Sequence, residues 1–216
     1  MKKVIWSFSL LVMALFLSCR EDDADRFFSG QNDKLIINFS VQDPTSGLAT
    51  RSAIAPEAGE ENVKTLDLFF FESNSTGTGT FKGLKELIAT PENPLVMNTD
   101  MVFDFSDIGL SMTEPYDILI VANMGDNYLP TDGSQTLADW KSVIQRKNYK
   151  EAKAEIQVFM SGTDTNVPEY TTKPLESDAL LMSASLKKGK QDTKLKAVLQ
   201  RAVSRFDIYN LAAGYT

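Results

Sequence analysis

The stretch Val63–Glu72, with the sequence VKTLDLFFFE, constrains the fold more than any other part of this chain. Its residues alternate in character, and successive side chains of a β-strand point to opposite faces of a sheet. One face is wholly apolar, whereas the other begins with polar residues and ends with Phe69 and Phe71. This pattern predicts a central strand of a sandwich, covered on one face and partly covered on the other. The wholly apolar face consists of Leu66, Leu68 and Phe70.

Other segments favour strands as well, so we expect a mainly β chain. Leu35–Val41 has the alternation of a half-buried strand, and Tyr116–Asn123 has that of a second core strand. Leu95–Met97 and Met101–Phe105 are expected to form short strands. The apolar face of the segment Leu35–Val41 consists of Leu35, Ile37, Phe39 and Val41.

The pattern of residues in Thr136–Lys147 predicts a helix. Thr136 and Asp139 stand at the spacing of an approximate capping box, and apolar residues follow on one helical face. Glu151–Met160 fits a continuation in helical form, so one or two short helices accompany the strands. The apolar face of the first helix consists of Leu137, Trp140, Val143 and Ile144.

Two segments close the chain, Ala179–Leu186 and Lys194–Asn210. In Lys194–Asn210, several apolar residues recur at the three- and four-residue spacing of a helix. Some apolar residues of this segment also recur at the two-residue spacing of a strand. The residues alone therefore leave helix and strand open for this segment.

The first 18 residues have the pattern of an export signal. Lys2 and Lys3 precede an apolar run, Val4–Leu17, which is short for a membrane span. Ser18 then stands directly before Cys19, the only cysteine of the chain, as in a bacterial lipobox. This motif predicts cleavage before Cys19 and acylation of its thiol and new amino group, and two or more acyl chains give lasting membrane attachment. An ordinary signal peptide with an incidental cysteine is the alternative.

Residues 19–34 form the next predicted part, a polar tether. Its first residues after Cys19 are REDDAD, an acidic run that resembles the surface-export signal of Bacteroidetes lipoproteins. A solvated linker is the alternative interpretation of the same run. Residues 35–216 then form the predicted β domain.

The charge of the chain argues against nucleic acid as a partner. Without Lys2 and Lys3 the chain keeps 20 basic against 29 acidic residues, a net charge near −9. Proteins bind nucleic acid by neutralising phosphates with lysine and arginine, and a hold on anionic lipid likewise needs basic residues.

The chain contains no histidine, and Cys19 is its only thiol. These absences remove Ser-His-Asp catalysis, imidazole metal sites and a free thiol nucleophile, so we expect no enzyme, no metal and no cofactor. Two alternatives stay open: a calcium site in loop 125–133 and a carboxylate pair of the glycosidase type. The loop carries Asp126, Asn127 and Asp132, but it lacks the spacing of a calcium-binding hand.

Asp43–Asn62 is a long connection between two predicted strands. It is rich in small and polar residues, and Arg51 is its only basic residue. Such a segment is expected to be exposed.

Four stretches in this order resemble the Bacteroidales fimbrillin superfamily, the subunits of type V pili and their lipoprotein relatives. They are the lipobox at Cys19, the loop with Arg51 before VKTLDLFFF, the strand YDILIVAN and the segment LQRAVSRFDIYN. The resemblance covers most of the chain after the signal and matches the family's N-terminal domain. It implies a transthyretin-like antiparallel β-sandwich over residues 35–216, with Lys194–Asn210 as a long strand. The family's second domain is expected to be missing.

The resemblance also implies a mechanism of assembly. In this family the precursor is exported as a lipoprotein, and an Arg-specific surface protease cuts the loop after the first strand. The matching position is Arg51, which would leave Ser52 as the new N-terminus. The first strand then leaves, and a donor strand of a neighbouring fimbrial subunit fills its groove. The displaced side chains would be Leu35, Ile37, Phe39 and Val41.

The leading interpretation is therefore a structural subunit of a fimbrium, held in the outer membrane of the cell surface by lipid. The alternative is an uncut lipoprotein, an adhesin or pilus anchor that binds a glycan or a surface partner. Tyr128 and Trp140 near a loop would serve such a binding site, although Trp140 also suits the core of its helix. A hydrolase that uses carboxylates is the third interpretation.

The lipid can be tested directly. Cys19→Ala should give a protein without acyl chains, because the substitution removes the thiol that is acylated. The wild-type protein should enter the detergent phase in phase separation, and its N-terminal peptide should carry the mass of acyl chains. A wild-type protein that stays in water and lacks that mass would contradict the lipobox.

Overall fold

The computed structural model describes residues 33–42, 62–125, 128–129, 133–161 and 179–201 of the chain. The chain divides into two compact units, residues 1–33 and 34–216, and the fold below is that of the second unit. Cys19, Arg51, Ser52, Asp126, Asn127 and Asp132 lie outside the described residues.

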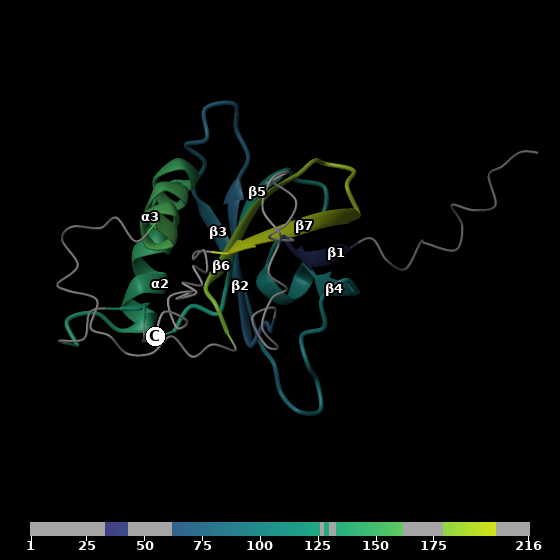
Figure 1. Cartoon of the computed structure of the whole chain (residues 1–216). Helices are drawn as coiled ribbons and strands as arrows, with labels where there is room; N and C mark the ends of the chain where they lie inside the picture. The colour runs from purple at the N-terminus through teal and green to yellow at the C-terminus, as the bar shows by residue number, and fades with distance from the viewer. Residues whose placement is uncertain (1–32, 43–61, 126–127, 130–132, 162–178, 202–216) are drawn as a thin grey trace, which may run out of the picture. The chain divides into compact units, whose positions relative to one another are not determined.

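Seven described strands form a single sheet in the order β3-β2-β5-β6-β7-β1-β4 (Figure 1). A 3-10 helix, η2 (Ser106–Ile108), connects β4 to β5. The strands are β1 (Lys34–Val41), β2 (Thr65–Glu72), β3 (Phe81–Ile88), β4 (Asp100–Asp104), β5 (Tyr116–Ala122), β6 (Met182–Lys188) and β7 (Lys194–Arg201).

The sheet is mixed and curls into a half-barrel. Strands β3, β2, β5 and β6 pair antiparallel, and β1 pairs antiparallel with β4. Strand β1 is parallel to β7, however. The junction between the two halves of the sheet is narrow, because β6 and β7 pair only through Met182 with Arg201 and Ser183 with Gln200. The two halves can therefore turn toward each other and share one core.

That core is apolar and lies between the two halves of the sheet. Alternate residues of each strand point into it, as the period of a β-strand requires. Phe70 contacts Phe105 and Tyr116 edge to face, with ring centroids 5.4 and 6.2 Å apart. Its fully buried members include Leu35, Ile37, Phe39, Leu66, Leu68, Phe70, Phe105, Ile118, Ile120, Ala197 and Leu199.

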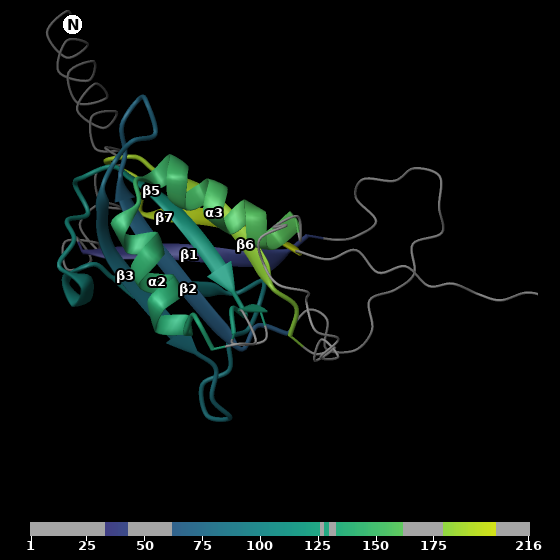
Figure 2. The ribbon, with the colours of Figure 1, turned by 90° about the vertical axis from the view of Figure 1, so that its left-hand side faces the viewer.

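Two helices, α2 (Leu137–Arg146) and α3 (Tyr149–Ser161), cover the other face of β2 and β5 (Figure 2). The predicted capping box begins α2: Asp139 N–H donates to Thr136 Oγ1 at 3.2 Å, and Thr136 N–H donates to Asp139 Oδ2 at 3.0 Å. Helix and sheet enclose a second apolar cluster, which includes Phe69, Phe71, Leu119, Val121, Trp140, Ile144, Ala152 and Ile156.

The structure confirms the predicted fold class, because the described chain is mainly β with two short α-helices. It also confirms the strands at Leu35–Val41, Val63–Glu72 and Tyr116–Asn123 within one or two residues. The fully antiparallel arrangement is wrong for the pair β1 and β7. Parallel strands need a long crossover, and here more than 150 residues of chain lie between the two partners.

Three other details differ from the sequence-based expectations. Phe81–Ile88 is a strand that no expectation assigned, and of Leu95–Met97 only Leu95 pairs, in an isolated bridge to Val63. For Lys194–Asn210, which the residues alone left open between helix and strand, residues 194–201 are a strand, as the resemblance implies, and the rest of the segment lies outside the described residues. The other face of β2 is buried along most of its length, because α2 covers it.

Two cross-strand partners in the core give a test of this fold. Leu68 of β2 lies opposite Ile120 of β5, and neither is exposed to solvent. Leu68→Asp and Ile120→Asp should each unfold the domain, because an unpaired buried carboxylate costs several kcal/mol against a total stability of roughly 5–15 kcal/mol. Ile88→Asp, at a strand position that is 69% exposed, is the matched control. Thermal denaturation distinguishes the variants, and cooperative melting of the first two near the wild-type temperature would contradict the core.

Candidate functional site

Strand β1 is inserted between two strands that lie far away in the sequence. It runs antiparallel to β4 over Lys34–Asn38 and parallel to β7 over Ile36–Val41. No strand next to it in the sheet is its neighbour in the chain. Its place in the sheet therefore depends on tertiary contacts and not on a hairpin.

The inner face of β1 is anchored in the core. Leu35, Ile37 and Phe39 are each 0% exposed, and Val41 is partly buried against the same cluster. The ring of Phe39 meets that of Phe103 on β4 edge to face, with centroids 6.1 Å apart. Burial of such side chains contributes roughly 1.5–3 kcal/mol each, so the three fully buried residues hold the strand firmly.

Further backbone hydrogen bonds extend the pairing of β1 on both of its edges. Ile36 N–H donates to Thr193 O at 2.8 Å, and Gln42 N–H donates to Leu199 O at 2.8 Å. On the other edge Asn98 N–H donates to Phe39 O at 2.6 Å. Removal of β1 would therefore open an apolar groove with unpaired backbone groups on both rims, which is a template for strand addition.

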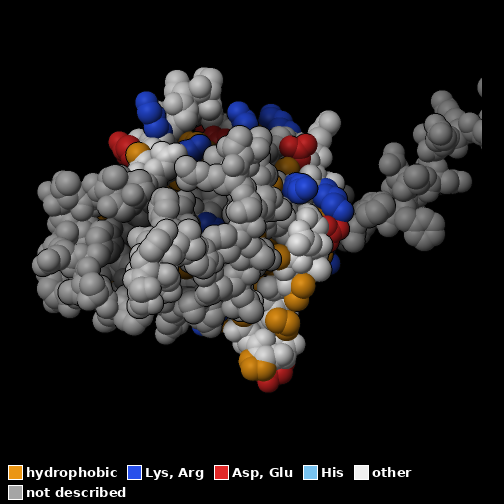
Figure 3. Space-filling view, in the orientation of Figure 1, with side chains coloured by type: hydrophobic (Ala, Val, Ile, Leu, Met, Phe, Trp, Pro, Cys, Tyr) orange, Lys and Arg blue, Asp and Glu red, His pale blue; other side chains and the backbone are white. Residues whose placement is uncertain are grey.

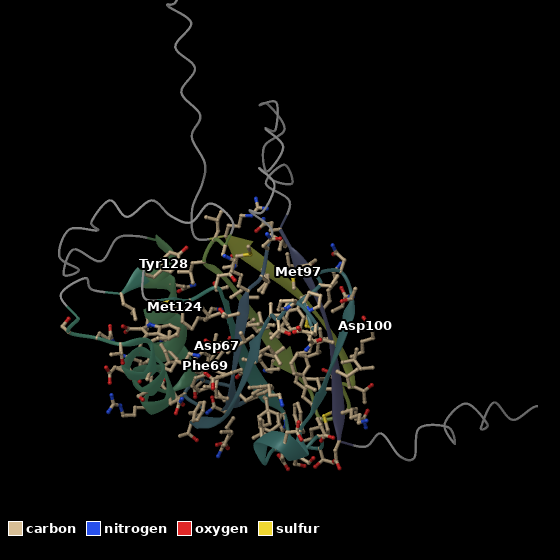
Figure 4. The ribbon with its side chains drawn as sticks, turned by 90° about the horizontal axis from the view of Figure 1, so that it is seen from below. Asp67, Phe69, Met97, Asp100, Met124 and Tyr128 are labelled. Carbon is tan, nitrogen blue, oxygen red and sulfur yellow. The ribbon has the colours of Figure 1, made fainter. Side chains whose placement is uncertain are left out.

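The outer face of β1 carries a polar bridge that joins three strands. Asp100 of β4 accepts a hydrogen bond from Asn38 Nδ2 of β1 at 3.0 Å and one from Lys194 Nζ of β7 at 2.6 Å. The hydrogen bond from Lys194, followed by that from Asn38, lowers the pKa of Asp100 below its ordinary value. We call Asp100, Asn38 and Lys194 the outer bridge. Figure 4 labels Asp100 on the side of the molecule where β1 and β4 lie.

The surface around the outer bridge is mixed in charge. Figure 3 shows lysine or arginine side chains beside acidic ones on the side where β1 and β7 lie. The side chains of Lys194 and Asp100 are 60% and 43% exposed. Water and salt therefore weaken their ion pair, so the outer bridge adds less to stability than the buried inner face of β1.

A second polar group, Lys188, lies fully buried at the end of β6. Its Nζ donates to three backbone carbonyls, those of Met112 at 2.5 Å, Glu114 at 3.1 Å and Gly189 at 2.9 Å. It also lies 5.7 Å from the ring centroid of Phe105 and 5.9 Å from that of Tyr116. Burial lowers the pKa of Lys188. All its contacts are internal, so it serves to join the 112–114 loop to β6.

A carboxylate pair lies under helix α2. Asp67 of β2 is opposite Glu86 of β3, and Lys141 Nζ of α2 contacts Asp67 Oδ1 at 2.9 Å and Glu86 Oε1 at 2.5 Å. Burial raises the pKa of Asp67, and the hydrogen bond from Lys141 opposes that rise. Figure 4 shows Asp67 beside Phe69. Lys141 pairs with both carboxylates, so this arrangement attaches α2 to the sheet.

Tyr128 and Trp140, which the glycan-binding alternative would use, both contact other residues within the domain. Trp140 is 1% exposed and packs edge to face on Phe69, with centroids 6.0 Å apart. Its role in the core is thus confirmed. Tyr128 is partly exposed, and its hydroxyl accepts a hydrogen bond from Leu181 N–H at 2.9 Å. These two side chains therefore do not form an exposed stacking surface.

The described residues offer little for other site chemistry. Among them no group of three or more Asp, Glu, His or Cys side chains could hold a metal ion. No helix in the described part of the chain is both long and apolar enough to span a bilayer.

The outer bridge was missed at the level of sequence. The alternation of Leu35–Val41 does place Asn38 on the solvent face. However, its partners Asp100 and Lys194 are 62 and 156 positions further along the chain, and only the strand register brings them together.

Comparison with known proteins found a distant structural likeness. No protein-family model and no curated protein matches the sequence. Among solved structures the chain is similar to a candidate cell adhesion protein from Parabacteroides distasonis ATCC 8503, with 13% sequence identity and a TM-score of 0.40. The likeness covers 76% of this chain, and this chain spans only 39% of that protein. The resemblance to fimbrillins stays a prediction.

The anchoring of β1 can be measured with two truncations on its inner face. Phe39→Ala should lower the free energy of unfolding by about 3–5 kcal/mol, because it removes a fully buried ring and its contact with Phe103. Val41→Ala, at a partly buried position of the same strand, should lower it by less. Denaturant titration of both variants makes the comparison, and equal losses would show that Phe39 is not the main anchor.

Proposed function

We propose that this chain is a structural subunit of a cell-surface fimbrium, exported as a lipoprotein and assembled by protease-triggered strand exchange at β1. The observation that carries the proposal is the position of β1: its side chains fill the core, yet both its partners are distant in the chain. A strand with this topology can be replaced by an equivalent strand of another molecule without breaking any hairpin.

A cut after Arg51 would separate β1 from everything that follows. The strands that form both rims of the groove and the opposite wall of the core, β2 to β7, would remain on one continuous piece. The apolar inner face makes loss of β1 unfavourable unless another apolar strand takes its place. Exchange therefore needs both a cut and a donor, and it links neighbouring subunits by main-chain hydrogen bonds.

The remaining parts of the proposal concern the cell surface. Lipid on Cys19 would hold the precursor in the outer membrane, and the acidic run after it would direct it to the outside. The partners are then an Arg-specific surface protease and other fimbrial subunits that supply donor strands. No catalysis, metal or cofactor is part of this function.

One observation favours a second function, that of an uncut surface lipoprotein which binds a glycan or another partner. Strand β1 is bonded along both edges and packed on its inner face, so the domain is complete without a donor. An adhesin or a pilus anchor needs no exchange. The two functions differ in whether Arg51 is cut.

Limited proteolysis of the native protein tests the first function. An Arg-specific protease should give one major new N-terminus, at Ser52, because the connection 43–61 carries one basic residue. The cut protein should then exchange β1 for an added apolar peptide with the sequence of residues 33–42, as N-terminal sequencing and native mass spectrometry would show.

The controls use single arginines. Arg51→Ala should abolish both the cut and the exchange, whereas Arg146→Ala, in the last turn of α2, should leave both unchanged. A native protein that resists cleavage at Arg51, or that is cut there and takes up no strand, would leave the uncut lipoprotein as the function.

A further inference from the structure

The outer bridge spans β1 from one neighbouring strand to the other. Lys194 stands opposite Ile36 in the register of β7, and Asp100 stands opposite Asn38 in that of β4. The lysine reaches across the outer face of β1 to the carboxylate. If β1 leaves, Lys194 and Asp100 remain on the two rims of the groove.

The carboxylate of Asp100 uses its two oxygens differently. Oδ2 accepts from Lys194, which belongs to the rim, and Oδ1 accepts from Asn38, which belongs to β1. Loss of β1 therefore leaves Oδ1 facing the groove without its protein donor. A strand that enters in the direction of β1 places one outward side chain at this position.

We propose that Asp100, held by Lys194, selects the strand that fills the groove by the side chain at the position of Asn38. This inference rests on the proposed strand exchange and names the chemistry of its partner. The preferred segment carries an amide donor at that outward position. The next residue on either side points inward and is large and apolar, as Ile37 and Phe39 do in β1.

A carboxylate at that position is disfavoured. It would lie directly opposite Asp100, and like charges on paired strands destabilise a sheet. The single positive charge of Lys194 would then lie beside two negatively charged carboxylates. Because the outer bridge is partly exposed, water and salt screen this repulsion, so the selection is moderate in size and strongest at low salt.

The intact chain gives the first measurement. Asn38→Asp should lower the melting temperature more than Ser40→Asp, which puts the same charge on the same face of β1, two residues away. Strand β4 does not extend to Ser40 in its pairing with β1, so a carboxylate there does not lie opposite Asp100. Ser40→Asp loses the hydrogen bond that the Ser40 hydroxyl donates to Ala197 O, so each variant loses one side-chain donor. The double variant Asn38→Asp with Asp100→Asn exchanges donor and acceptor and should recover most of the loss.

The cut protein gives the second measurement. Labelled peptides with the sequence of residues 33–42 would compete for the groove after cleavage at Arg51. The Asn38→Asp peptide should bind about fivefold more weakly than the parent peptide, and the Ser40→Asp peptide within about twofold of it. Protein with Asp100→Asn should lose this discrimination, and 1 M salt should reduce it.

The outcomes separate this inference from strand exchange itself. If the parent peptide does not bind, strand exchange fails and this inference fails with it. If all three peptides bind equally, or if Asp100→Asn leaves the discrimination unchanged, exchange stands and selection by Asp100 is wrong. Weaker binding of the Asn38→Asp peptide alone, removed by Asp100→Asn, is the result that supports it.

Discussion

The burial of the inner face of β1 between two curled halves of a sheet is the constraint on which the rest of this structure depends. Leu35, Ile37 and Phe39 have no exposed surface, and they share one apolar cluster with side chains of the neighbouring strand β4 and of β2 and β5 in the other half of the sheet. Without them the two halves would enclose a groove instead of a core. A narrow junction at Met182 and Ser183 allows the halves to face each other, so a single sheet behaves almost as a sandwich.

The two faces of β1 divide their roles. The inner face contributes most of the stability, because burial of apolar surface is the larger energy, and any apolar strand of similar shape could supply it. The outer face contributes less energy, and its proposed role is selectivity, because Asp100, which Lys194 holds, meets Asn38 at one register. A strand-exchanging subunit needs both properties, because the apolar face alone would accept many strands.

Buried polar groups hold the ends of β5 and β6. Lys188 joins three carbonyls below the rings of Phe105 and Tyr116. Asn123, with a φ of 61°, ends β5: its Oδ1 accepts from Lys64 N–H at 2.7 Å, and its Nδ2 donates to Asn62 O and Leu180 O at 2.8 Å. Asparagine tolerates this left-handed conformation better than most residues. None of these contacts involves β1.

The sequence by itself determined which face of each main strand is apolar, where α2 begins, and that the chain is mainly β, because period and capping are local properties of neighbouring residues. It also excluded histidine chemistry by composition alone. Only the tertiary structure decided that β1 runs parallel to β7, that Asp67 is buried beside Lys141, and that Asn38 and Lys194 both donate to Asp100. The place and register of β1 depend on contacts between residues more than 60 positions apart, and alternation within one strand carries no information about its partners.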